Sequence, residues 1–243
     1  MSDAALLEVR GCTVRFGGIC ALKNVDFKIS NREIVGLIGP NGAGKTTLLN
    51  AITNFVKREK GKILFQGEDI SNLSPYEICK RGIARTFQLT RAFDRLTVFE
   101  NVLISSLLRQ PLEEAELFAD KILEMIKLSA KKDRLAGELT VLERKTLELG
   151  RALATQPKLL LLDEIMAGLK PAEVDEVCFL LKKINEESEI AMLVVEHNMR
   201  AIWQLCERVI VLNFGEKIAE GPPNEVANDP KVIESYLGEK FVA

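Results

Sequence analysis

The chain has 243 residues and a formal net charge of −2, and 47% of its residues are hydrophobic and 28% charged. This composition is typical of a globular protein with a sizeable core, and the charge gives no reason to expect nucleic-acid binding. No apolar run approaches the roughly 20 residues that span a bilayer, and the first residues lack the basic and apolar segments of a secretion signal. The five cysteines include no C-x-x-C pair, so we expect free thiols, no metal site built on cysteine, and a cytoplasmic location.

The first thirty residues carry the pattern of β-structure. Residues 7–10 and residues 25–29 alternate apolar with polar side chains, which predicts two strands. Phe16 lies between them in a glycine-rich stretch. Two interpretations stay open for it: an ordinary core phenylalanine, which the residues alone favour, or an exposed aromatic ring available for stacking.

Residues 39–46 fit the pattern G-x-x-x-x-G-K-[ST]. An apolar run at residues 33–38 predicts a buried strand before it, and residues 47–52 predict the first turns of a helix after it. Such a loop lets backbone N–H groups approach an anion closely, so the pattern predicts a protein that binds a nucleoside triphosphate. We expect Lys45 to meet the β- and γ-phosphates and Thr46 to ligate Mg²⁺. The expected phosphate-binding residues are Gly39, Pro40, Asn41, Gly42, Ala43, Gly44, Lys45, Thr46 and Thr47.

Helical and strand patterns alternate through the rest of the chain. A strand is expected at residues 61–65, and residues 93–128 are helical in pattern. Their apolar stripe is expected to face the core and consists of Phe118, Ile122, Met125 and Ile126. Residues 158–162 predict a strand buried on both faces, and residues 173–184 predict an amphipathic helix. Two further strands are expected at residues 191–195 and 208–212.

This order predicts an α/β fold: a P-loop core with a parallel sheet, an N-terminal antiparallel β-subdomain and an inserted helical subdomain. We expect one nucleotide-binding domain over residues 1–243. Residues 1–90 and 156–243 would form the β-subdomain and the core, and residues 91–155 the helical subdomain.

Three polar residues follow apolar strands. Asp163 and Glu164 end the strand at residues 158–162, and His197, the only histidine, follows the strand at residues 191–195. The carboxyl ends of parallel strands meet at one edge of a sheet, so these side chains should lie beside the phosphate loop. There Asp163 would hold Mg²⁺, Glu164 would polarise a water for attack on the γ-phosphorus, and His197 would contact the γ-phosphate.

Together these residues resemble, over essentially the whole chain, the ATP-binding subunit of an ATP-binding cassette (ABC) transporter. The resemblance implies that Phe16 stacks on the adenine of ATP and that Gln88 ligates Mg²⁺ and senses the membrane subunit. It also implies that Glu164 is the catalytic glutamate and that Lys45 and His197 meet transition-state charge.

Four stretches are similar to the branch of the family that imports branched-chain amino acids: residues 82–88, 96–102, 167–173 and 219–238. The resemblance implies a homodimer or heterodimer that clamps two ATP molecules head to tail at the inner face of the cell membrane. We further expect a transmembrane permease subunit to dock near Gln88–Val102, because this stretch mixes apolar and charged side chains, namely Phe93, Leu96, Val98 and Phe99 with Arg91, Asp94 and Arg95. The alternative is that these apolar residues fill the helical subdomain.

One segment departs from the family. Its signature, usually Leu-Ser-Gly-Gly-Gln or Leu-Ser-Tyr-Gly-Gln, is replaced at residues 139–143 by Leu-Thr-Val-Leu-Glu. In the family this segment covers the γ-phosphate bound to the partner. Thr140 keeps a hydroxyl, but we expect Leu142 to obstruct the approach of the anion and Glu143 to repel it. A regulatory or weakly hydrolysing cassette is therefore the alternative function.

Two other classes fit less well. Soluble ABC ATPases that act on DNA or ribosomes need a long coiled-coil insertion or tandem cassettes, and the chain has room for neither. A GTPase would carry an Asn-Lys-x-Asp motif, which this sequence lacks.

Overall fold

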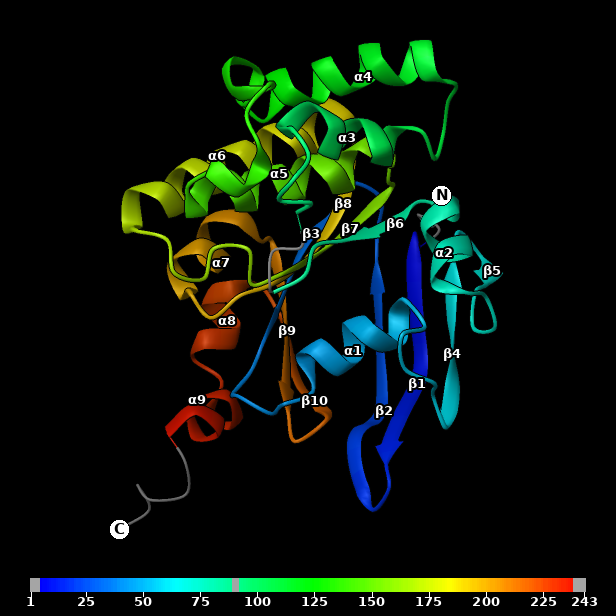
Figure 1. The fold of residues 1–243 in the computed structure, drawn as a ribbon. Helices are drawn as coiled ribbons and strands as arrows, with labels where there is room; N and C mark the ends of the chain where they lie inside the picture. The colour runs from blue at the N-terminus through cyan, green and yellow to red at the C-terminus, as the bar shows by residue number, and fades with distance from the viewer. Residues whose placement is uncertain (1–4, 89–91, 238–243) are drawn as a thin grey trace.

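The computed structural model describes residues 5–88 and 92–237, which form two β-sheets with helices around them (Figure 1). The four-stranded sheet is antiparallel, in the order β2 (Ile19–Ile29), β1 (Leu7–Phe16), β4 (Lys60–Phe65), β5 (Glu68–Asp69). The six-stranded sheet has the order β10 (Glu216–Gly221), β9 (Arg208–Asn213), β3 (Ile34–Ile38), β8 (Ala191–Val195), β7 (Leu159–Asp163), β6 (Ile83–Arg85). Its strands are parallel except in the β9–β10 hairpin. The predicted α/β fold with an antiparallel N-terminal sheet is thus confirmed.

The helices are α1 (Lys45–Ile52), α2 (Pro75–Arg81), α3 (Val98–Ser106), α4 (Leu112–Met125), α5 (Val141–Ala154), α6 (Pro171–Ser188), α7 (Met199–Leu205), α8 (Pro223–Ala227) and α9 (Pro230–Leu237). Short 3₁₀ turns occur at Ser129–Lys131 and Ala136–Glu138. Figure 1 shows α3, α4 and α5 grouped at the top and the four-stranded sheet at the right. Within the described ranges, no helix is both long and apolar enough to cross a bilayer.

Two hydrophobic clusters cover the two faces of the six-stranded sheet. Leu159 and Leu161 of β7 belong to the cluster that also contains α1 and the four-stranded sheet. Leu160 and Leu162 belong to the cluster that contains α3 to α7. Because successive side chains of a strand point to opposite faces, β7 is buried on both, as its continuous apolar run predicts.

The region predicted to be helical from residue 93 contains two separate helices. Helix α3 begins only after Thr97, which forms a capping box with Glu100. The buried Asn101 holds the preceding segment as a loop, because its Oδ1 accepts the Phe93 N–H at 2.9 Å and its Nδ2 donates to the Phe93 carbonyl at 3.1 Å. Pro111 then precedes α4. The predicted stripe of α4 does pack against the core.

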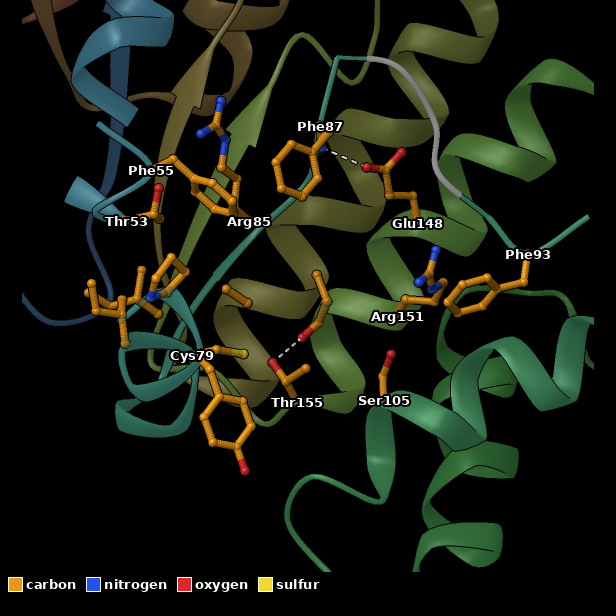
Figure 2. Close-up of a pocket in the computed structure, with 16 residues that line it drawn as sticks. Thr53, Phe55, Cys79, Arg85, Phe87, Phe93, Ser105, Glu148, Arg151 and Thr155 are labelled. Atoms are coloured by element: carbon orange, nitrogen blue, oxygen red, sulfur yellow. Dashed lines mark hydrogen bonds between the residues drawn. The ribbon is translucent and has the colours of Figure 1, made fainter. Parts of the chain in front are cut away.

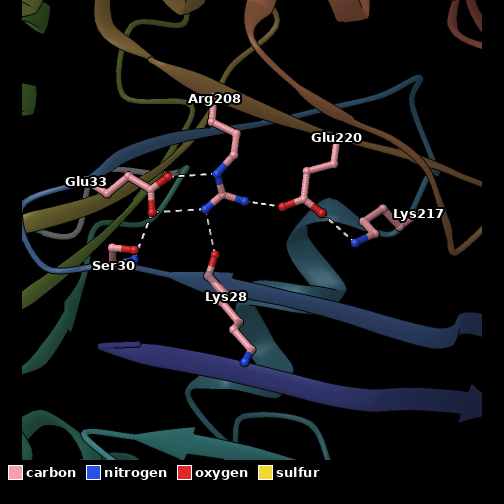
Figure 3. Close-up of polar contacts among 6 residues, drawn as sticks. All are labelled: Lys28, Ser30, Glu33, Arg208, Lys217 and Glu220. Carbon is pink, nitrogen blue, oxygen red and sulfur yellow. Dashed lines mark hydrogen bonds and ion pairs between the residues drawn. The ribbon is translucent and has the colours of Figure 1, made fainter. Parts of the chain in front are cut away.

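A charged cluster connects the start of β3 to the C-terminal hairpin (Figure 3). The Arg208 guanidinium donates to both Glu33 carboxylate oxygens, at 2.7 and 2.9 Å, and to the Lys28 carbonyl at 2.7 Å. Arg208 also pairs with Glu220 of β10, which Lys217 contacts in turn at 2.5 Å. The cluster thereby joins the β2–β3 connection to both β9 and β10.

Candidate nucleotide-binding site

A glycine-rich loop connects β3 to α1, and two of its glycines admit no other residue. A Cβ atom on Gly39, whose φ is +148°, would lie 2.1 Å from the Leu212 carbonyl oxygen. A Cβ atom on Gly44, whose φ is +104°, would lie 2.7 Å from the Ala21 carbonyl oxygen. The neighbouring strands therefore require glycine at both positions.

The N-terminus of α1 is open to a ligand. Among the described residues, no side chain caps α1 and no acidic residue lies in its first turn. Asn41, Gly42 and Thr46 are exposed around it. Lys45 is buried, and its Nζ donates to the carbonyls of Gly39 at 2.7 Å and Pro40 at 3.0 Å. Burial lowers the pKa of Lys45, against the opposing charges of the nearby acids. The loop thus concentrates backbone donors and one ammonium group around a space suited to phosphate.

Asp163 lies at the end of β7 and is 1% exposed. Its Oδ2 accepts from Arg85 Nη2 at 2.7 Å, while Arg85 Nη1 donates to Asn50 Oδ1 of α1 at 2.6 Å. Asp163 Oδ1 is also buried and makes no hydrogen bond within the described part of the chain. Arg85 thus fixes Asp163 to the phosphate-loop helix and leaves one carboxylate oxygen for another ligand.

Glu164 brings together two other predicted site residues. Its Oε1 lies 2.9 Å from His197 Nε2, and its Oε2 accepts from Gln88 Nε2 at 2.8 Å. Glu164 has φ of +53°, a region that glutamate rarely adopts. Its N–H donates to the Val195 carbonyl at 2.9 Å, which holds this conformation. Glu164 and His197 therefore lie together at one sheet edge, as predicted, and the contact with Gln88 is an addition that strand direction did not predict.

Phe16 lies at the tip of the β1–β2 hairpin, paired with Ile19, and is 50% exposed. The interpretation as a core phenylalanine is therefore wrong. The β9–β10 turn connects this hairpin to the phosphate loop, because the Gly215 N–H donates to the Ala43 carbonyl at 3.0 Å and the Gly215 carbonyl accepts the Lys23 N–H at 2.8 Å.

The altered signature segment forms the N-terminus of α5. Thr140 Oγ1 accepts the Glu143 N–H at 3.4 Å, and Glu143 Oε2 accepts the Thr140 N–H at 3.0 Å, which makes a capping box. Glu143 also pairs with Lys131, and that pairing, followed by the bonds to Thr140, lowers its pKa. Leu142 is partly buried against the core, so the expected obstruction by its side chain is wrong. The exposed side chain is instead Val141, at 60%.

The predicted docking region is only partly exposed. Val98 is fully buried and Phe99 packs against the core, because both belong to the inward face of α3, so the prediction is wrong for Val98. Phe93 is 46% exposed. Arg91 lies outside the described residues.

Sequence reasoning missed three charged residues: Arg85, which contacts Asp163, and Lys145 and Glu196, which lie near Glu164. Glu196 is 3% exposed, and burial followed by the charge of Glu164 raises its pKa to about 7. Lys145 of α5 donates to the Glu164 carbonyl at 3.4 Å, and burial lowers its pKa. The signal for Glu196 was present in the sequence, as an acid directly after the apolar run of residues 191–195.

Comparison with known proteins identifies the family. The family described as ABC transporter matches residues 22–167, and the family described as branched-chain amino acid ATP-binding cassette transporter matches residues 216–242. The high-affinity branched-chain amino acid transport ATP-binding protein BraF of Pseudomonas aeruginosa is 36% identical over 96% of this chain and 98% of its own. LivG of Salmonella typhimurium, of the same description, is 39% identical over the same shares. The lipopolysaccharide export system ATP-binding protein LptB of Haemophilus influenzae is 37% identical over 90% of this chain and 92% of its own.

Solved structures agree with this assignment. A nucleotide-free ATP-binding cassette from an ABC transporter superimposes with a TM-score of 0.87 at 33% identity, covering 97% of this chain and 100% of that chain. The ADP conformation of such a cassette gives 0.87 at 34% identity and the same coverage. A dimeric post-hydrolysis cassette with ADP and phosphate gives 0.80 at 28% identity, covering 89% of this chain and 98% of that chain. The chain therefore belongs to the ABC transporter family, as an ATP-binding cassette that hydrolyses ATP.

Proposed function

We propose that this chain is the ATPase subunit of a membrane importer for branched-chain amino acids or related small amides. The observation that carries the proposal is the Glu164 carboxylate, held between His197 and Gln88 beside the phosphate loop. BraF and LivG support the substrate class, and the C-terminal match at residues 216–242 agrees with them. LptB belongs to an export system. The identity of the permease that binds this chain would therefore distinguish an importer from an exporter.

In this proposal the residues 39–47 hold the phosphates of ATP, with Lys45 as the charged contact, and Phe16 stacks on the adenine. Mg²⁺ fits the residues present, because the buried Asp163 Oδ1 lacks a hydrogen-bond partner in the described structure. Hard divalent cations prefer such oxygen atoms. The Thr46 hydroxyl and the Gln88 amide oxygen would complete the protein ligands, and the bound ion would neutralise phosphate charge.

Glu164 is the group that we assign to polarising the attacking water. Its two contacts fix the orientation of the carboxylate, since His197 engages one oxygen and Gln88 the other. His197 is additionally placed to meet the γ-phosphate, and Lys45 to stabilise charge that develops during transfer.

Glu164→Gln tests this assignment. The amide keeps both neighbours in reach but polarises water poorly, so we expect Mg-ATP binding to persist while turnover falls by roughly a hundredfold or more. Gel filtration with Mg-ATP should then reveal a trapped dimer. Glu186→Gln, at an exposed position of α6, is the matched control. Wild-type turnover in Glu164→Gln would remove the proposed catalytic role.

A cavity of about 520 Å³ beside this site is the proposed docking place for a cytoplasmic helix of the permease. Figure 2 shows Phe55 and Phe87 on one side of it and Phe93 on the other. The Phe55 and Phe87 rings meet edge to face at 6.0 Å, and the Arg151 guanidinium lies 4.6 Å from the Phe93 ring centre. Aromatic side chains beside charged ones suit an amphipathic helix.

The docking proposal is tested in the complete transporter. Phe93→Asp should uncouple transport while basal ATPase activity stays within about twofold, because the change affects the contact and not the chemistry. Leu117→Asp, at a 67% exposed position of α4 outside the cavity, is the control and should transport normally. Normal transport by Phe93→Asp would contradict the docking site.

A weakly hydrolysing cassette is the second candidate function. The capping box at Thr140 and Glu143 favours it, because the N-terminus of α5 is already satisfied by its own side chains. In a homodimer both composite sites would receive this segment. In a heterodimer only the site that holds the partner's ATP would receive this segment.

A further inference from the structure

Glu196 occupies an unusual place for an acid. It directly follows β8, whose five residues are all buried, and directly precedes His197. Its side chain is nearly inaccessible, and the residue is 3% exposed. Burying a carboxylate costs free energy unless hydrogen bonds compensate, so its contacts indicate why it is there.

The Glu196 carboxylate connects two loops. Its Oε1 accepts the Met166 N–H at 2.8 Å, and Glu196 itself directly precedes His197 in the chain. Met166 lies two residues after Glu164. One buried side chain therefore joins the turn that follows β7 to the segment that follows β8.

Several backbone groups of the turn after β7 have hydrogen-bond partners. The Glu164 N–H donates to Val195, and the Glu164 carbonyl accepts from Ala167 N–H at 3.1 Å and from Lys145 Nζ at 3.4 Å. Glu164 starts the turn with positive φ, a conformation that persists only when surrounding contacts hold it. Glu196 supplies the contact in the middle of the turn.

We propose that Glu196 is a positioning residue for ATP hydrolysis, which holds the Glu164 turn in register with His197. The Glu164–His197 contact of 2.9 Å joins two loops that follow different strands. Without the carboxylate, Met166 N–H is left buried and unpaired, and the turn shifts to satisfy it. The side-chain hydrogen bond of Glu196 to Met166 reaches the turn after β7 and not the phosphate loop at residues 39–47, so we expect the shift to affect the chemical step rather than ATP binding. The inference rests on the proposed function, since it acts through Glu164.

The experiment compares Glu196→Ala with Glu196→Gln in Mg-ATP turnover and in equilibrium ATP binding. We expect Glu196→Ala to lower kcat by about tenfold or more with the ATP Kd changed by less than about twofold. The amide oxygen that Glu196→Gln introduces still accepts the Met166 N–H, so this variant should turn over at least about threefold faster than Glu196→Ala.

Glu33→Gln is the matched control. Glu33 is also partly buried and accepts a backbone N–H, that of Ser30, at 2.8 Å. It precedes β3, whereas Glu164 follows β7, and the strand register places them at opposite ends of the sheet. The turnover of Glu33→Gln per folded molecule should match that of the wild type.

Two results would overturn the inference: wild-type kcat in Glu196→Ala, or equal rates in the Ala and Gln variants. Urea unfolding shows whether Glu196→Ala folds poorly. If it does, the kcat of the nearly isosteric Glu196→Gln variant decides whether the positioning role holds. Measuring Glu164→Gln in parallel distinguishes a failure of the positioning role from a failure of the proposed function. If Glu164→Gln is inactive and Glu196→Ala is not, only the positioning role fails; if Glu164→Gln is active, the proposed function itself fails.

Discussion

Two helix N-termini in this protein are built in opposite ways. Helix α1 starts after Gly44 with neither a capping side chain nor an acid in its first turn, within the described residues. Helix α5 starts after Thr140, which forms a complete capping box with Glu143 in the first turn. Both ends carry the same partial positive charge from aligned peptide dipoles. The difference lies in what neutralises that charge: in the proposed function a phosphate of ATP would do so at α1, whereas the chain's own carboxylate does so at α5.

The contrast has an energetic consequence for the signature segment. A capped N-terminus is worth about 1 kcal/mol to the folded chain. An incoming phosphate at α5 would compete with Glu143, which Lys131 also holds. Helix α1 lacks this local stabilisation, and its free backbone donors are the ones that we propose bind the phosphates of ATP.

The largest expected effect is at the uncapped N-terminus of α1, here called the open end, in contrast to the capped N-terminus of α5, the closed end. Lys45→Ala should weaken Mg-ATP binding by roughly a hundredfold, because it removes the one ammonium buried in the phosphate loop. Isothermal titration measures the affinity. Lys57→Ala, at an exposed position after α1, is the control. An affinity near wild type for Lys45→Ala would mean that backbone donors alone account for binding.

Opening the closed end should raise activity. Replacing residues 140–143 with Ser-Gly-Gly-Gln removes the Glu143 charge and the exposed Val141 side chain, so turnover of the isolated chain should rise about tenfold or more. Val141→Gly and Glu143→Gln tested separately show which change matters. If the restored variant is no faster than wild type, another step limits the rate.

Closing the open end should weaken binding. Thr47 is the third residue of α1, the position that Glu143 occupies in α5. Thr47→Glu should therefore weaken Mg-ATP binding roughly tenfold by placing a carboxylate beside the phosphates. Thr47→Gln carries a similar side chain without charge and should weaken binding much less. Equal losses in the two variants would point to steric crowding instead.

The smallest effect concerns the stability of the closed end. Glu143→Ala should lower the free energy of unfolding by about 1 kcal/mol at neutral pH. Lys131 and Thr140 lower the pKa of Glu143 below its ordinary 4.5 in the folded chain. The folded state thus holds the carboxylate ionised at pH values where the unfolded state binds a proton. The difference between wild type and variant should be complete above pH 4.5 and shrink as pH falls through the lower folded value, as measured by urea unfolding at several pH values. Glu138→Ala, at an exposed acid nearby, is the control variant.

The parts of the site that sequence alone predicts are those with local causes. The phosphate loop follows from residues adjacent in the chain, and the sheet edge for Asp163, Glu164 and His197 follows from strand direction. The contacts that involve Arg85 and Glu196 were not predictable in this way, because their partners lie 78 and 30 residues away and depend on how the strands pair.

Side-chain direction at helix starts was the other source of error. Leu142 stands one position from the exposed Val141, and only the packing of α5 against the core decides which of them faces inward. Val98 was predicted to be available for docking because the sequence did not show that its side chain faces the core at the start of α3. Apolar periodicity indicates that a face exists, but not where a short helix begins along it.

The position of β3 also governs how the protein can be made. Its two neighbours in the sheet, β8 and β9, come much later in the chain, and the Arg208–Glu33 pair joins residues 175 positions apart. At translation rates of about 5–20 residues per second, the ribosome delivers the phosphate loop on the order of ten seconds before the strands that flank it. During that interval β3 lacks both of the strands that flank it in the folded sheet. A chain that stops before Arg208 lacks β9, whose Leu212 carbonyl lies against Gly39, although every residue of the phosphate loop has already been synthesised.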